Sequence, residues 1–434
     1  MLENEIAQLG AVIRGAVTKD KKADALTTRR LARVRRRDFT LKYHEDFGFA
    51  HFSPERIEQD IWDWRDQERF QDSVVKNLEQ YKALAAALGS NSDPLETFAR
   101  AVSLASFHGL DDTELSERVA ALGRELEGEP LPVKVTAFID GLSIRESPLI
   151  ISDRFTLRQP TPEDVAEYVI VDEYGGFSFP LNETWFRVVG EFLDDAVSTG
   201  AAQGEFLRTV EALRLFRVGG ITTSRYGMRS RHPLLVGQWD VISSGPSRHS
   251  RFAYTLSASD AADLNRFLHD IVPLLPDPFQ PDRAATETEI AYTRYRDALF
   301  QDGPSERTIT SAITALEALF LKGEPELAHR LAQRVSVFLR VLGTRPDAGT
   351  TYGHVSRGYR IRSTFIHGNS LKAKDRPQAD SLAPVLMEYA RECALAFLQI
   401  SAPKEEVLSQ LDRAMIDPAT VNGLAASLGS VAHR

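Results

Sequence analysis

The sequence predicts an α+β protein of several domains, and three observations support this. The chain has 434 residues, which is enough for two or three domains. Its 43% of hydrophobic residues can supply separate cores. Apolar residues recur at helical spacing near both ends of the chain, whereas the middle alternates with period two. We therefore expect a helical segment over residues 1–130, a mixed, strand-rich segment over 131–285 and an all-helical segment over 286–434.

The first segment is expected to be helical throughout. One apolar series has near-helical spacing and comprises Ile57, Ile61, Trp64, Phe70, Val74, Leu78 and Tyr81. A second helix is predicted to begin at Asp93, with Pro94 at its first position, and to stop at Gly109. The stretch from Thr18 to Lys42 is the densest basic run. We interpret it as a solvated arm or helix face, and an RNA-contacting arm is the alternative.

The middle segment is rich in β-branched and aromatic residues punctuated by Gly and Pro, which is typical of strands. The stretches expected to form strands are residues 133–144, 148–160, 168–180, 233–244 and 251–259. A short helix or turn is predicted at 161–169, and a longer helix is predicted through 205–218, ending at Gly219. The basic stretches 224–232 and 245–251 are expected to be exposed loops, and a phosphate-facing rim of arginines is the alternative. We expect this segment to have a sensory or regulatory role.

The last segment is predicted to contain five or six helices between Thr286 and Met415, after the Pro-rich linker 272–283. Pro325 and Gly343 mark the start and end of one of these helices. Two apolar stripes at helical spacing support the prediction: Ile309, Ile313, Leu316 and Phe320, followed by Leu327, Leu331, Val335, Phe338 and Leu342.

The composition makes several classes of protein improbable. No apolar run is long enough for a membrane span, and acidic residues stand where a signal peptide would be positive, so we expect a soluble, cytoplasmic protein that does not bind membranes. Cys393 is the only cysteine, and no common metal motif is present, so no metal or other cofactor is expected. The net charge of -9 argues against nonspecific coating of nucleic acid, although local basic patches can still bind it.

The stretch YRIRSTFIHGNS, residues 359–370, carries the candidate site. Arg362 occupies a position in an otherwise apolar helical stripe, which comprises Tyr352, Val355, Tyr359, Arg362 and Ile366. A buried arginine is costly unless it is paired, so Arg362 should meet a carboxylate, line a cleft or lie at a subunit junction. Glu317 is a candidate partner. One interpretation is therefore a structural Arg362–Glu317 ion pair, with His367 at an exposed helix end.

The other interpretation is a catalytic arginine and histidine. His367 directly precedes Gly368, the expected helix cap, and the negative end of the helix should favour a protonated imidazole. Such a group can act as a general acid or bind a phosphate, and a neighbouring arginine can stabilise phosphate charge. Spacing alone is weak support, because Arg37 with His44 and Arg225 with His232 fit it too.

Three stretches taken together, AITALEALFL, ELAHRLAQRVSVFLR and YRIRSTFIHG, resemble the ApeA-like branch of the HEPN superfamily. These helical domains have an arginine-histidine signature of this spacing and include defence and toxin ribonucleases. The resemblance covers about the last third of the chain, and the stretch 142–165 is more loosely similar to the region that precedes such domains. It implies a homodimer in which two motifs face each other and cut RNA by attack of the ribose 2′-hydroxyl, without a metal.

Carried over from the resemblance, Arg362 would bind and polarise the scissile phosphate, and His367 would serve in acid-base catalysis. Arg360 would be auxiliary, although it lies nearer the face of His367 on a straight helix. Ser363 fills a slot that is often polar in the superfamily, and Asn369 could add a hydrogen bond. The resemblance also implies a role in antiviral defence or as a toxin, with an unknown trigger or antitoxin. The alternatives are a catalytically inactive RNA- or nucleotide-binding module and a purely structural dimerisation protein.

Overall fold

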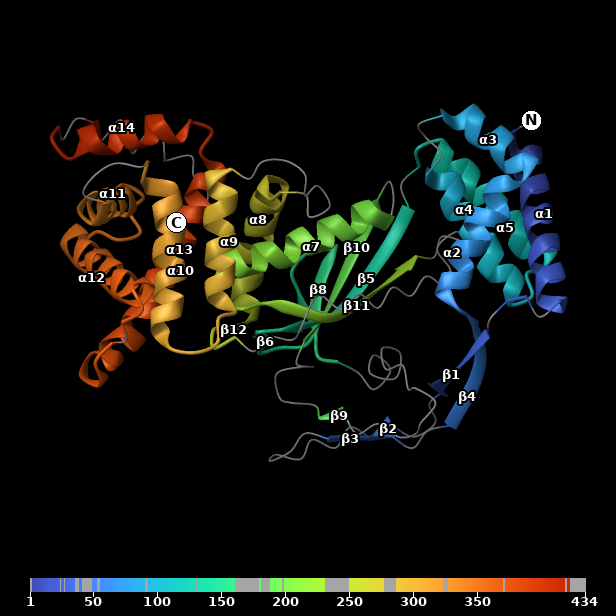
Figure 1. The fold of residues 1–434 in the computed structure, drawn as a ribbon, viewed down its shortest axis with the longest axis horizontal. Coiled ribbons are helices and arrows are strands. Elements are labelled where there is room, and N and C mark those ends of the chain that lie inside the picture. Colours follow the sequence, from blue (N-terminus) through green and yellow to red (C-terminus); the bar gives the residue numbers. More distant parts are fainter. Residues whose placement is uncertain are drawn as a thin grey trace. The chain divides into compact units, whose positions relative to one another are not determined.

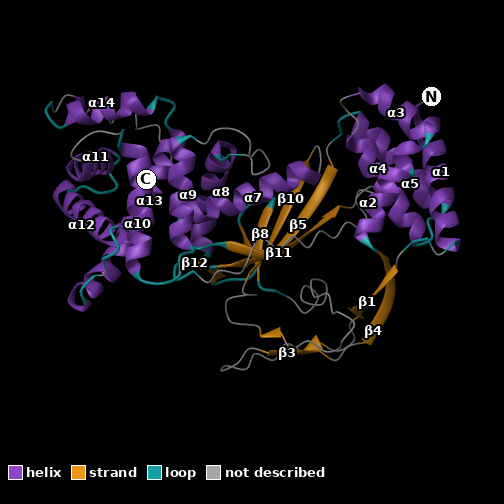
Figure 2. Ribbon diagram, in the orientation of Figure 1, coloured by secondary structure: helices purple, strands orange, loops and turns teal. Residues whose placement is uncertain are grey.

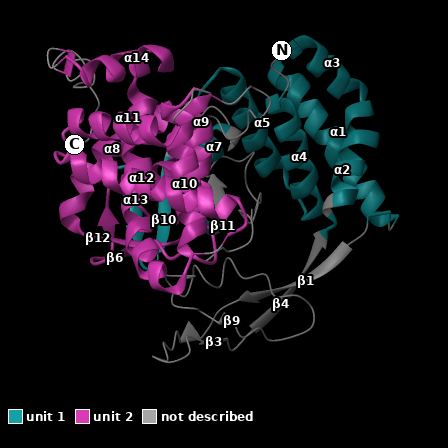
Figure 3. Ribbon diagram, turned by 60° about the vertical axis from the view of Figure 1, so that its left-hand side comes forward, with its two compact units in different colours: residues 1–139, 152–206, 223–245 teal, residues 140–151, 207–222, 246–434 magenta. Residues whose placement is uncertain are grey.

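The computed structural model (Figure 1) combines helices with mainly antiparallel strands, which confirms the α+β class. It describes residues 2–23, 25–26, 28–35, 39–40, 49–52, 55–89, 93–129, 131–160, 179–180, 188–196, 199–230, 250–276, 286–322, 327–369, 371–417 and 420–421. The chain forms two compact units with interleaved ranges (Figure 3). The first comprises residues 1–139, 152–206 and 223–245, and the second comprises 140–151, 207–222 and 246–434. Neither unit coincides with one predicted segment, so the division into three domains stays a prediction.

The N-terminal part contains helices and strands, so the prediction of a wholly helical segment is wrong (Figure 2). Its helices are α1 (Leu2–Lys22), α2 (Trp64–Ser73), the 3₁₀ helix η1 (Val75–Asn77), α3 (Glu79–Leu88), α4 (Asp93–Phe107) and α5 (Asp112–Leu126). Its strands are β1 (Thr28–Arg35), β2 (Phe39–Thr40), β3 (Phe49–Phe52) and β4 (Glu55–Trp62). The helix predicted to begin at Asp93 is confirmed, and Gly109 follows it with a φ of 98°.

The apolar series from Ile57 to Tyr81 is divided between a strand and two helices. Residues up to Trp62 form β4, which pairs antiparallel with β1. The helix begins only after Asp63, whose side chain accepts a hydrogen bond from the Arg65 N–H at 3.0 Å. Pairing with a distant strand thus overrides the helical spacing of the first residues in the series.

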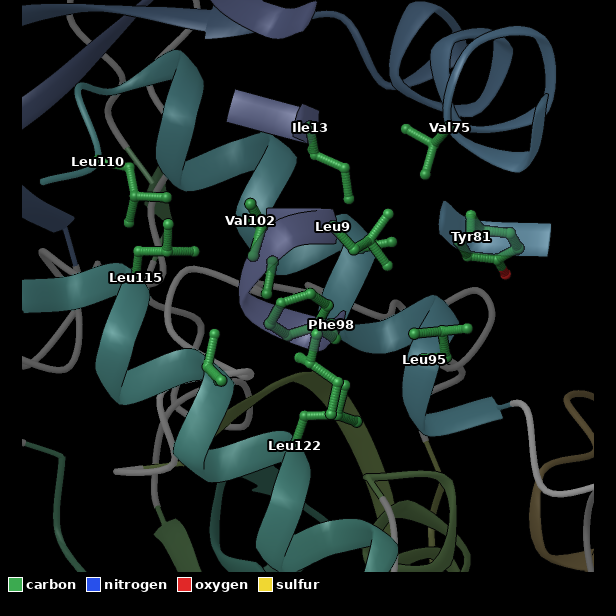
Figure 4. Packing of buried hydrophobic residues seen from close by; sticks show 14 of the residues in the cluster. Leu9, Ile13, Val75, Tyr81, Leu95, Phe98, Val102, Leu110, Leu115 and Leu122 are labelled. Atoms are coloured by element: carbon green, nitrogen blue, oxygen red, sulfur yellow. The ribbon is translucent and has the colours of Figure 1, made fainter. Parts of the chain in front are cut away.

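Helices α1, α4 and α5 enclose the core of this part (Figure 4). Leu9 and Ile13 of α1 are fully buried, as are Phe98 and Val102 of α4 and Leu122 of α5. These positions recur every three or four residues in each helix, so each helix presents one apolar stripe to the others.

The middle of the chain forms a five-stranded sheet in the order β11-β5-β10-β8-β7. Its strands are β5 (Leu131–Asp140), β7 (Leu149–Ile150), β8 (Phe155–Arg158), β10 (Val188–Ala196) and β11 (Thr222–Ser230). A parallel pair, β6 (Leu142–Ile144) and β12 (Tyr254–Leu256), lies in the second unit, and β9 (Phe179–Pro180) pairs with β3. Phe192 of β10 is opposite Val135 of β5 and Phe155 of β8, which fixes the register of the sheet.

Most predicted strands that fall on described residues are present, but one predicted loop is wrong. Residues 224–230 belong to β11 at the sheet edge, next to β5. Their basic side chains suggested a loop, yet a strand at an edge tolerates charged residues because one of its sides is open to solvent. The stretches 161–169 and 233–244, and all of 168–180 except β9, lie outside the described residues.

The predicted helical segment after Thr286 is confirmed. The described residues from Thr286 to Asp417 contain α9 (Glu287–Leu299), α10 (Ser305–Phe320), α11 (Leu327–Val341), α12 (Ala348–Ile366), η6 (Ala373–Asp375), α13 (Arg376–Gln399) and α14 (Lys404–Ala414), and no strand. Helix α10 packs against α9, α12 and α13. Phe320, Phe338 and Phe397 form the aromatic centre, with ring centroids 5.2–5.3 Å apart.

Upstream of these helices, the second unit contains α8 (Ala261–Ile271), flanked by η4 (Ala258–Asp260) and η5 (Val272–Leu274). It also contains the C-terminal half of α7 (Thr199–Phe216), which ends three residues before the predicted stop at Gly219.

The last four carbonyls of α7 are all bonded by side chains of the second unit. Tyr254 donates to the Leu213 carbonyl and Tyr295 donates to the Arg214 carbonyl, each at 2.7 Å. Arg391 of α13 donates to the Leu215 and Phe216 carbonyls at 2.8 and 3.4 Å. The last turn of a helix leaves four carbonyls without a partner in the helix, and here all four are satisfied. We call Tyr254, Tyr295 and Arg391 the carbonyl clamp.

A half-buried carboxylate strengthens the same junction. Glu211 of α7 accepts hydrogen bonds from Tyr292 and Arg214 and lies 3.6 Å from the Arg296 guanidinium. Burial alone would raise the pKa of Glu211, but the two arginines and the tyrosine outweigh it and hold that pKa below its ordinary value. The carboxylate therefore stays ionised and tied to both α7 and α9.

Tyr295→Phe should lower the free energy of unfolding by about 1–3 kcal/mol, because it leaves the buried Arg214 carbonyl without a donor. Urea denaturation followed by circular dichroism measures this. Tyr352→Phe is the matched control, since the one described partner of the Tyr352 hydroxyl is the exposed His329, and it should cost less than about 0.5 kcal/mol. Equal stability of wild type and Tyr295→Phe would contradict the importance of the clamp.

Candidate functional site

Helix α12 (Figure 1) carries most of the predicted site residues. Both of its ends are capped. At its start, Asp347 accepts hydrogen bonds from the Gly349 and Thr350 N–H groups at 3.0 and 3.2 Å. At its end, Gly368 has a φ of 78°, and its N–H donates to the Phe365 carbonyl at 3.0 Å. The Asn369 N–H donates to the Thr364 carbonyl at 3.1 Å. This is a Schellman motif, so the predicted glycine cap after His367 is confirmed.

The predicted apolar stripe of α12 is only partly correct. The residues of α12 that are buried are Thr351, Val355, Gly358 and Ile361. From the predicted stripe, Val355 is buried but Ile366 is 53% exposed. The cause is Gly358, where an added Cβ would lie 2.6 Å from Leu386 and 2.9 Å from Ile313. The glycine lets α12 approach α10 and α13 closely, and this turns the buried face away from Ile366.

Arg362 forms the predicted ion pair with Glu317 of α10. The Arg362 Nη2 and Glu317 Oε2 atoms are 3.0 Å apart, and the side chains are 25% and 15% exposed. The guanidinium carbon also lies 5.6 Å from the centre of the Tyr359 ring. The Arg362 Nε atom is buried and has no hydrogen-bond partner. Burial raises the pKa of Glu317, and the attraction of Arg362 only partly offsets this.

The other predicted residues lie toward solvent at the end of α12. Arg360, His367 and Asn369 are exposed, and Ser363 is half-buried. No hydrogen bond or ion pair from the described part of the chain reaches the side chain of Arg360 or of His367. Five residues correspond to about 140° around a helix, so Arg362 and His367 point to different sides, whereas Arg360 and His367 are within about 20° of each other. The structure thus brings Arg362 to Glu317, and not Arg362 to His367.

The sequence around α12 has an excess of positive charge, which the arginine-histidine spacing alone does not reveal. Residues 348–374 contain Arg357, Arg360, Arg362, Lys372 and Lys374 but no Asp or Glu, in a chain of net charge -9. Burial and the positive charge of Arg357 hold the pKa of His354 below its usual value. The absence of acidic residues over this length is a sequence signal that could have identified Arg357, Lys372 and Lys374 as candidate ligands of an anion.

The described residues contain no metal site and no membrane-spanning helix, and they leave out most side chains of the other basic stretches. Among the described residues, no group of three or more His, Cys, Asp or Glu could hold a metal ion, and no helix has the length and apolar character of a membrane span. In the basic run from Thr18 to Lys42, the side chains of residue 24 and of residues 27–42 lie outside the described residues. The same is true of the side chains in the two other arginine-histidine pairs, Arg37 with His44 and Arg225 with His232.

Comparison of the chain with protein-family models, curated proteins and solved structures gives no match. The resemblance of the C-terminal helices to the HEPN superfamily therefore stays an expectation, and the function must be argued from α12 itself.

Arg362→Ala should destabilise the protein by about 1–3 kcal/mol near neutral pH, because a half-buried Glu317 loses its partner. The deficit should grow as the pH rises from about 4 to about 8. A raised pKa in the folded state means that the folded chain holds the Glu317 proton more tightly, so stability falls as that proton is lost. Removing Arg362 raises the pKa of Glu317 further, so the stability of the variant falls by more over the same pH range.

Urea denaturation across this pH range checks the prediction. The double variant Glu317→Gln/Arg362→Ala is the control, because it lacks the titrating group and its deficit should be nearly independent of pH. A pH-independent deficit in the single variant would show that the ion pair contributes no stability.

Proposed function

We propose that the chain is a metal-independent endoribonuclease whose C-terminal helices form an ApeA-like HEPN domain. The observation that carries the proposal is the acid-free, cationic α12 segment, which ends in an exposed histidine at a capped helix terminus. Cations attract the phosphates of RNA, and an exposed imidazole can exchange protons with bound substrate. The three stretches that carry the resemblance lie in α10, α11 and α12.

The chemistry would use the ribose of the RNA as nucleophile. The 2′-hydroxyl loses a proton and its oxygen bonds the adjacent phosphorus, while the bond from phosphorus to the 5′-oxygen breaks and that oxygen gains a proton. His367 would carry one of these protons, and Arg362 would stabilise the charge on the phosphate oxygens. Arg360 would bind a neighbouring phosphate. Ser363 and Asn369 flank these groups and could add hydrogen bonds.

Two copies of the chain would complete such a site. Within one chain Arg362 and His367 point to different sides of α12, so a composite cleft between two copies is one way to bring them to the same phosphate. Tyr352 and Tyr359 are half-buried and Ile366 is exposed, and they follow each other at intervals of seven residues. This spacing suits a seam between two helices related by twofold symmetry. We therefore propose a homodimer through this flank of α12.

A binding module without catalysis is the second candidate. The Arg362–Glu317 ion pair favours it, because an arginine fixed by a carboxylate has a structural role already. Such a module would need the cations of α12 but not His367. A role in antiviral defence or as a toxin, and sensing of a trigger by the first two segments, rest on the resemblance alone. A cytoplasmic location is an expectation from the composition.

His367→Ala and Arg362→Ala should each lower RNA cleavage by about 10²–10⁴-fold, as expected for loss of an acid-base group or of charge stabilisation. Cleavage should survive EDTA, and products should carry 2′,3′-cyclic phosphate and 5′-hydroxyl ends. Sequencing of RNA ends after incubation with each purified variant measures this. His269→Ala is the matched control, since that side chain is 86% exposed on α8.

Arg362→Lys separates a catalytic role from a structural one. Lysine keeps the positive charge beside Glu317 but lacks the planar fork that grips a phosphate, so cleavage should still fall at least about tenfold while stability changes little. Full activity of His367→Ala, or cleavage that requires a metal, would leave the binding module as the better explanation.

Light scattering at micromolar concentration should give twice the 48.4 kDa mass of one chain. Ile366→Glu should produce monomers and abolish cleavage, because a carboxylate in an apolar seam is costly to bury. Ile290→Glu is the control, since Ile290 is 42% exposed on α9 and lies outside the seam, and this variant should stay dimeric. A monomeric wild-type protein with intact cleavage would rule out the composite site.

A further inference from the structure

The solvent face of α12 forms one continuous cationic surface. Arg357, Arg360, Thr364 and His367 follow each other at intervals of three or four residues, so they share one side of the helix. Arg360 and His367 are exposed, and Arg357 and Thr364 are half-buried. Lys372 and Lys374 are exposed just beyond the cap. We call Arg357, Arg360, His367, Lys372 and Lys374 the cationic face.

Three other arginines of the second unit have carboxylate partners, whereas the arginines of this face have none among the described residues. Arg345 pairs with Glu392 at 2.7 Å, Arg391 with Glu388 at 2.9 Å, and Arg334 with Asp412 at 2.7 Å. No carboxylate among the described residues pairs with Arg357 or Arg360. Like charges one turn apart on a helix repel each other, so this face is costly in the free protein. A bound polyanion would remove that cost.

The length of the face suits a strand of nucleic acid better than a single small anion. Ten residues separate Arg357 from His367, which corresponds to about 15 Å along the helix axis. An isolated phosphate could contact only one end of such a face, whereas a strand can place several phosphates along it.

We propose that the cationic face binds the sugar-phosphate backbone of single-stranded RNA and guides it along α12, separately from Arg362, which Glu317 holds on the other side. The inference rests on the proposed function in taking RNA as the ligand. It adds a binding surface that includes Arg357, Lys372 and Lys374. It also assigns the same RNA strand to Arg360 and His367 of one copy of the protein.

The test is fluorescence anisotropy of the full-length protein with a labelled single-stranded RNA of about twelve nucleotides. Its riboses carry 2′-O-methyl groups, so it cannot be cut. Affinity is measured over a range of salt concentrations for wild type, Arg357→Ala/Arg360→Ala and Lys372→Ala/Lys374→Ala. Alanine preserves the helix, and circular dichroism checks folding. Arg266→Ala is the control, because Arg266 is an exposed arginine of α8 paired with Asp263.

Each double variant should bind at least about tenfold more weakly at ~0.1 M salt, and the slope of log affinity against log salt should fall by about 1.4, or 0.7 for each lost phosphate contact. Arg266→Ala should bind within about twofold of wild type. Binding of the Arg357→Ala/Arg360→Ala variant that equals wild type in affinity and slope would overturn the inference. Tighter binding of duplex RNA than of the single strand would also overturn it.

The two proposals fail in different ways. If the wild-type protein binds RNA through these residues but cuts none, the cationic face stands and the nuclease does not. If it cuts RNA while the Arg357→Ala/Arg360→Ala variant binds normally, the nuclease stands and the cationic face does not.

Discussion

The carbonyl clamp at the end of α7 is the interaction on which the second unit depends. Tyr254 of β12, Tyr295 of α9 and Arg391 of α13 come from three separate parts of the sequence, and they meet at four consecutive carbonyls. Unsatisfied carbonyls in a buried helix end are costly, so this arrangement strongly favours one position of α13 relative to α7. Helix α13 then packs against α10 and α12, and Leu386 lies where Gly358 leaves room. The placement of α12 therefore follows from the clamp.

That placement gives α12 two chemically different sides. One side holds Arg362 against Glu317 in partial burial, where the ion pair contributes to the packing of α10 on α12. The other side presents Arg360 and His367 to solvent without acidic neighbours in the sequence. If RNA is cut here, phosphates would meet the exposed side first. Arg362 would reach a phosphate only if that phosphate competes with Glu317 or if a second copy of the chain supplies the other half of the site.

Some of these features were predictable from the sequence because they depend on local signals. The helices after Thr286, the cap at Gly368 and the Arg362–Glu317 pair follow from apolar spacing, glycine chemistry and the cost of burying a charge. The helical phase of α12 was not predictable, because Gly358 contributes no apolar side chain and yet packs closely against Leu386 and Ile313. Strands β4 and β11 were missed since their pairing partners, β1 and β5, are distant in sequence. That Arg357 has no carboxylate partner among the described residues likewise required the structure.

The most direct test of this account is photo-crosslinking of a thiouridine-containing single-stranded RNA to the full-length protein, followed by mass spectrometry of the crosslinked peptides. The account predicts adducts within residues 348–374, on the exposed side of α12 and just beyond its cap. Adducts confined to the basic run from Thr18 to Lys42, or none on the C-terminal helices, would contradict it and would place RNA recognition in the N-terminal part of the chain.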